Sequence, residues 1–208
     1  MFPTTQNSIT DLSSALAQSK VQDSSNSSSG KAYIKFDYKT GSFAYGRDQE
    51  DISGDEIVIN TYSFTHGWVL WSNGIPTKVM RSFTEELPPA MPSVGDDSPS
   101  EARGFEARFK DDEETVLVFE SNSHGGRSGV DALLGKVGLR SAGGETEFLF
   151  PVVKLISESY KAAKGGTVHN PVFEIVSWVN VEGKTSEDTP LIEDQAQTEE
   201  APRRKRRV

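Results

Sequence analysis

The sequence predicts a mainly β protein, an antiparallel barrel with one inserted helix and disordered tails. Three observations favour this fold class. Short runs of strand-forming residues follow one another between turn residues over 31–182. Within that range only 127–137 forms a convincing helix pattern, and both ends of the chain are rich in polar residues. We therefore expect a disordered segment 1–30, a β-barrel body 31–182 and a disordered acidic, then basic, tail 183–208.

The strands are justified by alternation of apolar and polar residues and by the turns between them. Asn73-Gly74 is the strongest turn signal, because a two-residue hairpin turn needs positive φ at both central positions. Residues 87–104 contain four prolines and are expected to form a loop. In chain order the predicted strands are 32–38, 42–45, 56–60, 66–72, 75–83, 104–110, 115–121, 145–156 and 171–181.

Composition excludes several classes of protein. There is no cysteine, so neither a disulfide nor a thiolate metal site can form. No run of apolar residues is long enough for a transmembrane helix. His66, His124 and His169 lie far apart without metal-ligand spacing, and no catalytic motif is present. We therefore expect no enzyme activity, no metal and no cofactor.

Charge counts against nucleic acid as a ligand. The net charge is −9, and most of the acidic excess lies in the body between the tails. Contacts with phosphate require local positive charge. A nucleic-acid-binding body must therefore gather its lysines and arginines on one face.

The segment 31–45 combines the two residue types that single-strand binding requires. Its lysines are interleaved with aromatic residues: Lys31, Tyr33, Lys35, Phe36, Tyr38, Lys39, Phe43 and Tyr45. Lysines neutralise the backbone and exposed rings stack on bases. Alternation places Tyr33 with Lys31 and Lys35 on one face and leaves Phe36 and Tyr38 for the core. The alternative is a half-buried hairpin whose lysines form an ordinary solvated face.

Two further segments offer aromatic or anion-binding groups. In 66–71, Trp68 and Trp71 point to opposite faces of a strand, and Trp68 is a candidate for stacking or for the core. In 123–129 a glycine-rich turn opens the predicted helix, where free N–H groups favour an anion and Arg127 is a candidate phosphate contact. The alternative there is a plain loop capped by Ser128.

Two basic segments complete the candidate nucleic-acid-binding set. Tyr160, Lys161 and Lys164 lie in a loop between two apolar strands, which a solvated hairpin loop explains equally well. The chain ends in a basic run that suits a nucleic-acid arm or a nuclear localisation signal. That run consists of Arg203, Arg204, Lys205, Arg206 and Arg207.

Two stretches, 66–68 and 150–178, together resemble a group of mostly unannotated tailed-phage proteins of about this length. The resemblance covers about residues 31–180 and extends to a Pro/Arg-rich C-terminus. It implies a role in phage DNA metabolism. The expected function is then non-catalytic binding of single-stranded DNA in replication or recombination, on a barrel like the oligonucleotide-binding (OB) fold. The alternative is a virion or host-interaction protein that uses the barrel to contact proteins.

The expected partners are single-stranded DNA and proteins of replication or recombination, with no membrane. The expected location is the cytoplasm of a bacterial host, or the nucleus if the host is eukaryotic. The residues leave open the oligomeric state and the choice between DNA and RNA.

Overall fold

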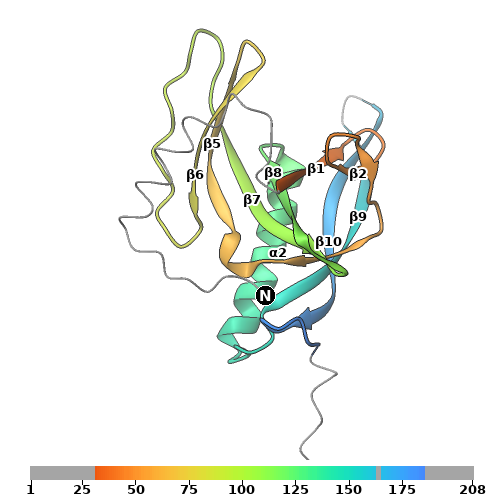
Figure 1. The fold of residues 1–208 in the computed structure, drawn as a ribbon. Coiled ribbons are helices and arrows are strands. Elements are labelled where there is room, and N and C mark those ends of the chain that lie inside the picture. The colour runs from red at the N-terminus through yellow and green to blue at the C-terminus, as the bar shows by residue number, and fades with distance from the viewer. Residues whose placement is uncertain (1–30, 163–164, 186–208) are drawn as a thin grey trace, which may run out of the picture.

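The computed structural model describes residues 31–162 and 165–185 (Figure 1). The expectations of disorder in 1–30 and in most of 183–208 fall outside these residues. In chain order the elements are β1 (Lys31–Asp37), β2 (Ser42–Tyr45), β3 (Glu50–Asp51), β4 (Glu56–Ile59), the 3₁₀ helix η1 (Thr61–Ser63), β5 (Thr65–Ser72), β6 (Ile75–Ser82), β7 (Ser100–Phe109), β8 (Asp112–Ser121), α2 (His124–Ala142), β9 (Phe150–Lys161) and β10 (Thr167–Val179).

The described strands form one sheet, which confirms the mainly β prediction. Its order is β10-β9-β4-β7-β8-β1-β2-β3, and β5 pairs with β7 on one side and β6 on the other. Every pairing is antiparallel except that of β1 with β8. The sheet is not closed, so the expected barrel and its likeness to an OB fold are not confirmed. Among the described residues, no helix is long and apolar enough to cross a membrane.

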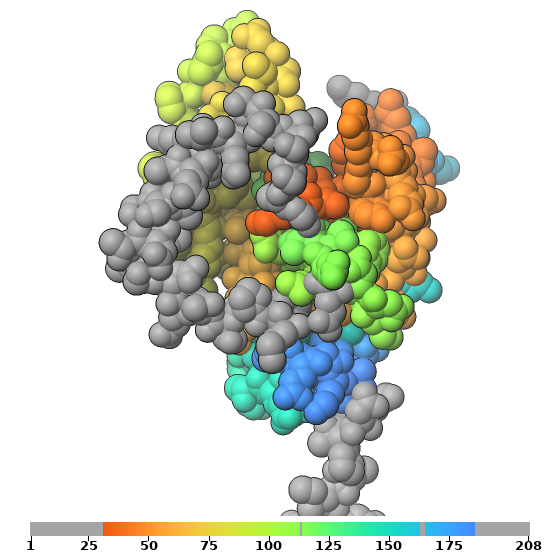
Figure 2. All heavy atoms as spheres, viewed as in Figure 1, coloured from red at the N-terminus to blue at the C-terminus, as the bar shows by residue number. Residues whose placement is uncertain are grey.

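The β5–β6 hairpin forms where the sequence predicts it. Asn73 and Gly74 have φ values of 53° and 78°, as a tight hairpin turn requires. Within the hairpin the backbones approach closely at Gly67, where a Cβ would lie 2.0 Å from the carbonyl oxygen of Val79. Figure 2 shows this hairpin and the β1–β2 region as two separate projections at one end of the molecule.

The main core lies between the sheet and α2. Phe105, Phe119 and Phe173 are each almost fully buried, and their ring centroids lie 5.1–5.4 Å apart. These residues come from β7, β8 and β10, so the three rings tie the β7–β8 hairpin to a strand that is distant in the chain. Ile34 of β1 and Phe43 of β2 extend the same core.

Several element boundaries differ from the prediction. The helix begins at His124 instead of 127 because the Ser123 side chain caps it, accepting the N–H of Gly126 at 3.0 Å. Ser128 lies within the helix and is not its cap. The strand expected at 145–156 is β9, which begins at Phe150 and continues to Lys161.

Alternation correctly predicts which side chains of β1 are buried and which are exposed, but it fails for Tyr38, just after the strand. Tyr33 is exposed and Ile34 is buried, as alternation predicts. Phe36 is half-buried and packs on Phe43 with ring centroids 4.7 Å apart. Tyr38 was expected in the core but is 57% exposed. The strand ends at Asp37, so alternation no longer governs the direction of the next side chain.

Candidate nucleic-acid interface

Three of the sequence segments singled out for binding meet at one cavity. The β1–β2 turn, the start of α2 and the tip of the β9–β10 hairpin lie at the same end of the molecule (Figure 1). Between them is a cavity of about 590 Å³. It is lined by Ile34, Lys35, Phe36, Tyr38, Phe119, Glu120, Ser121, Asn122, Ser123, His124, Gly125, Tyr160, Val168, His169, Asn170 and Pro171. This volume is within the range of small-molecule sites, roughly 300–1,000 Å³.

The β1–β2 turn forms one wall of the cavity and is fixed in place. The backbone N–H of His169 donates to the carbonyl of Tyr38 at 2.9 Å, which ties the turn to β10. The Asp37 carboxylate accepts the backbone N–H of Lys39 at 2.8 Å. That hydrogen bond holds the pKa of Asp37 below its ordinary value. The turn therefore presents Tyr38 from a rigid backbone.

The start of α2 forms the second wall. Gly125 faces Asn170 so closely that a Cβ on it would lie 2.1 Å from Asn170 Oδ1. The first N–H groups of a helix have no partner within the helix, and its N-terminus carries partial positive charge. His124 and Gly125 of this first turn line the cavity, while the Gly126 N–H is bonded to the Ser123 side chain. This wall is thus favourable for an anion.

The β9–β10 hairpin supplies Tyr160, His169 and Asn170. Tyr160 is 50% exposed, and Lys161 beside it is exposed too. Among the residues that the structure describes, no partner is recorded for the side chains of His124, His169 and Asn170. By contrast Ser121, Asn122 and Ser123 already bond within the protein. These three side chains therefore join Lys35, Tyr38 and Tyr160 as polar groups of the lining that a ligand could contact.

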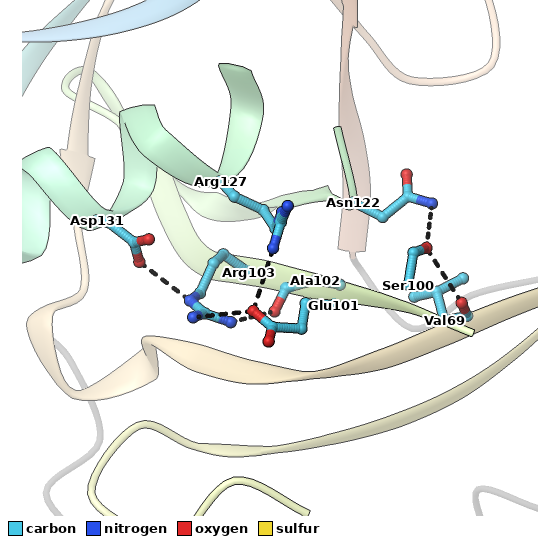
Figure 3. Close-up of polar contacts among 8 residues, drawn as sticks. All are labelled: Val69, Ser100, Glu101, Ala102, Arg103, Asn122, Arg127 and Asp131. Atoms are coloured by element: carbon cyan, nitrogen blue, oxygen red, sulfur yellow. Dashed lines mark hydrogen bonds and ion pairs between the residues drawn. The ribbon is translucent and has the colours of Figure 1, made fainter. Parts of the chain in front are cut away.

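A polar network fixes the start of α2 against β7 (Figure 3). Arg127 donates to Glu101 at 3.1 Å, and Arg103 joins Glu101 at 3.5 Å and Asp131 at 3.0 Å. Asn122 donates to Ser100 Oγ at 2.9 Å. Arg127 was a candidate phosphate contact, but it does not line the cavity and its guanidinium is paired. Its place in the network makes it a positioning residue.

Lys31 and Tyr33 lie away from the cavity lining. Lys31 is paired with Glu106 at 2.7 Å. Tyr33 is 49% exposed, but Lys78 of β6 lies 5.4 Å from the centre of its ring and is itself paired with Glu120. One face of the Tyr33 ring is thus in contact with a cation, as is one face of the Tyr38 ring, where Lys39 Nζ lies 5.9 Å from the ring centre. Lys35 lines the cavity, and both Lys35 and Lys39 are exposed.

Trp68 is half-buried, and its indole Nε1 donates to the carbonyl oxygen of Pro88 in the proline-rich loop at 2.7 Å. It does not line the cavity. Trp71 is the exposed tryptophan of the pair, at 51%. Lys164 and the basic run Arg203–Arg207 fall outside the described residues.

The sequence alone did not reveal His124, His169 and Asn170 as site residues. The two histidines are 45 positions apart in the chain, and the packing of α2 against β10 brings them to one cavity. No group of three or more side chains suited to a metal ion occurs in 31–162 or 165–185.

Comparison with known proteins does not assign this cavity a ligand. No protein-family model matches the chain, and neither the curated proteins nor the solved structures yield a match. The link with tailed-phage proteins and the binding of single-stranded DNA therefore stay predictions made from the sequence.

Proposed function

We propose that the protein binds single-stranded nucleic acid, with DNA as the preferred ligand, in the cavity between the β1–β2 turn, the start of α2 and the β9–β10 hairpin. One observation carries the proposal: basic and aromatic residues from distant parts of the chain meet there. Tyr38 and Tyr160 supply stacking surfaces, and the start of α2 supplies N–H groups for phosphate. Tyr160 belongs to β9, Tyr38 to the turn after β1 and the N–H groups to α2. The likeness of this open sheet to an OB barrel is part of the proposal.

The charge around the cavity supports this ligand despite the acidic body. Lys35, Lys39 and Lys161 are exposed. Among the described residues Lys35 and Lys161 form no ion pair, whereas the charge of Lys39 acts on the neighbouring Asp37 and contributes to lowering its pKa. Glu120, the acidic residue of the lining, is paired with Lys78. The basic run Arg203–Arg207 is the proposed accessory arm, which adds phosphate contacts without reading bases. The proposed place of action is phage DNA replication or recombination.

One observation favours protein binding as a second function. The β5–β6 hairpin exposes Trp71, Ile75 and Val79, which suits contact with an apolar partner. The two functions differ in their response to salt. Binding to nucleic acid weakens steeply as the salt concentration rises, because the release of counterions from the phosphates then contributes less free energy. Binding at an apolar protein interface lacks this steep salt dependence.

Tyr38→Ala and Tyr160→Ala are each expected to weaken binding of labelled oligo-dT by about 1–3 kcal/mol, because each removes a stacking surface. The measurement is a titration of the full-length protein by fluorescence anisotropy at two salt concentrations. Both tyrosines are exposed, so the melting temperature should change little.

Tyr62→Ala is the matched control. Tyr62 is 71% exposed and does not line the cavity. It should bind oligo-dT like the unchanged protein. If Tyr38→Ala and Tyr160→Ala bound oligo-dT as tightly as Tyr62→Ala and the unchanged protein, stacking at this cavity would be ruled out. If the unchanged protein did not bind oligo-dT, the proposed function would be ruled out.

A further inference from the structure

A second cavity, called here the α2 groove, adjoins the cavity of the proposed single-strand site. It has a volume of about 280 Å³ and lies between α2 and the β9–β10 hairpin. Gly125, Asn170 and Pro171 line both cavities. A strand bound in the first cavity therefore has the α2 groove directly beside it, where the first turn of α2 meets β10.

One face of α2 forms a wall of the groove from Gly125 to Lys136. The helix packs closely on β10 there, because a Cβ on Gly129 would lie 2.8 Å from the carbonyl oxygen of Pro171. A helix rises about 1.5 Å per residue, so this wall is about 16 Å long. Successive nucleotides of a stacked strand are about 3.4 Å apart. The wall is therefore long enough for several nucleotides.

The charged residues of the groove lie on different walls. Lys136 of α2 is exposed at the end of the groove farthest from the first cavity, and it forms no ion pair among the described residues. Glu158 of β9 is exposed on the other wall and lies opposite Asn170 in the β9–β10 pairing. Phosphate is attracted to the lysine and repelled by the carboxylate. A strand in the groove would thus keep its backbone on the side of α2.

We propose that the α2 groove continues the single-strand site, so that a bound strand leaves the first cavity past Gly125 and runs along α2 with its phosphates towards Lys136. The inference rests on the single-strand binding proposed above and adds the path of the strand beyond Tyr38 and Tyr160. Ala132 and Val172, from the two walls of the groove, offer apolar surface to the bases. An oligonucleotide too short to leave the first cavity does not reach Lys136.

Lys136→Gln tests this path with the full-length protein and labelled oligo-dT of two lengths. Lengths of about 4 and about 16 nucleotides span the usual range of single-strand sites. For the long oligonucleotide, the slope of log K against log[salt] should fall by about 0.7, the contribution of one phosphate contact. For the short one it should stay unchanged. Lys154→Gln is the control with the same change in charge, because Lys154 is exposed on β9 and lines neither cavity.

Two further variants test the groove without removing a basic residue. Glu158→Gln should strengthen binding of the long oligonucleotide at low salt, because it removes a charge that repels phosphate. Its control is Glu174→Gln, since Glu174 is exposed on β10 and lines neither cavity. Ala132→Leu should narrow the groove and weaken binding of the long oligonucleotide alone. Melting temperatures would verify that each variant folds.

The possible outcomes separate this inference from the proposed function. If Lys136→Gln behaved like Lys154→Gln at both lengths, the path along α2 would be wrong and single-strand binding would stand. If Lys136→Gln lowered the slope equally for the short oligonucleotide, the groove would not be an extension reached only by longer strands. If the unchanged protein bound neither oligonucleotide, the function and the path would fail together.

Discussion

Phe173→Ala is expected to lower the free energy of unfolding by about 3–5 kcal/mol, the range for removing a buried phenylalanine. Phe173 is 3% exposed. Its ring centroid lies 5.1 Å from those of Phe105 and Phe119 and 6.1 Å from that of Phe43. Alanine would remove the ring on which three others pack, and those rings belong to different strands. Urea unfolding at 25 °C, followed by circular dichroism, would measure the loss.

Val176→Ala is the matched control on the same strand. Val176 is 45% exposed on β10, so its truncation should cost no more than about 0.5 kcal/mol. If the two variants were equally stable, Phe173 would not hold the sheet and helix together. Such a result would also remove the basis for the position of β10, which carries His169 and Asn170 to the cavity.

The double variant Lys35→Gln and Lys161→Gln is expected to reduce both the affinity for oligo-dT and its salt dependence. Each phosphate contact on a single strand contributes about 0.7 to the slope of log K against log[salt], so the slope should fall by about 1.4. The loss of affinity should be greatest at low salt. A series of oligo-dT titrations between 50 and 200 mM salt, roughly the range over which this effect is large, would measure it.

Arg47→Gln and Arg81→Gln together form the control with the same change in net charge. Both arginines are exposed, and neither lines the cavity. If the control lost as much affinity and slope as the lysine variant, binding would depend on overall charge. The cavity would then have no special part in it.

Local chemistry made much of the fold predictable from the sequence. Asn73-Gly74 predicted a hairpin because few other pairs adopt positive φ at both positions, and the strand 42–45 agrees with β2. The helix was expected to begin later, at 127, because its first turn contains two glycines, which are weak helix formers. It also continues beyond the predicted end at 137, to Ala142. The Ser123 cap and the network around Arg127 stabilise that turn.

Pairing between distant strands was beyond sequence reasoning. The parallel contact of β1 with β8 joins residues more than 80 positions apart, and no local pattern specifies its register. That contact, with the bond between Tyr38 and His169, creates the cavity. The sequence therefore indicated Lys35 and Tyr160 but favoured Tyr33 and Trp68, which the fold places against Lys78 and the proline-rich loop.

Photo-cross-linking tests the central claim most directly. Oligo-dT carrying one 5-iodouracil is bound to the full-length protein, irradiated, and the cross-linked peptides are mapped by mass spectrometry. A stacked base reacts with the aromatic ring that it contacts. The account predicts cross-links at Tyr38 or Tyr160, lost in the matching alanine variant. Cross-links confined to Trp71 on the β5–β6 hairpin, or to the basic run 203–207, would contradict it.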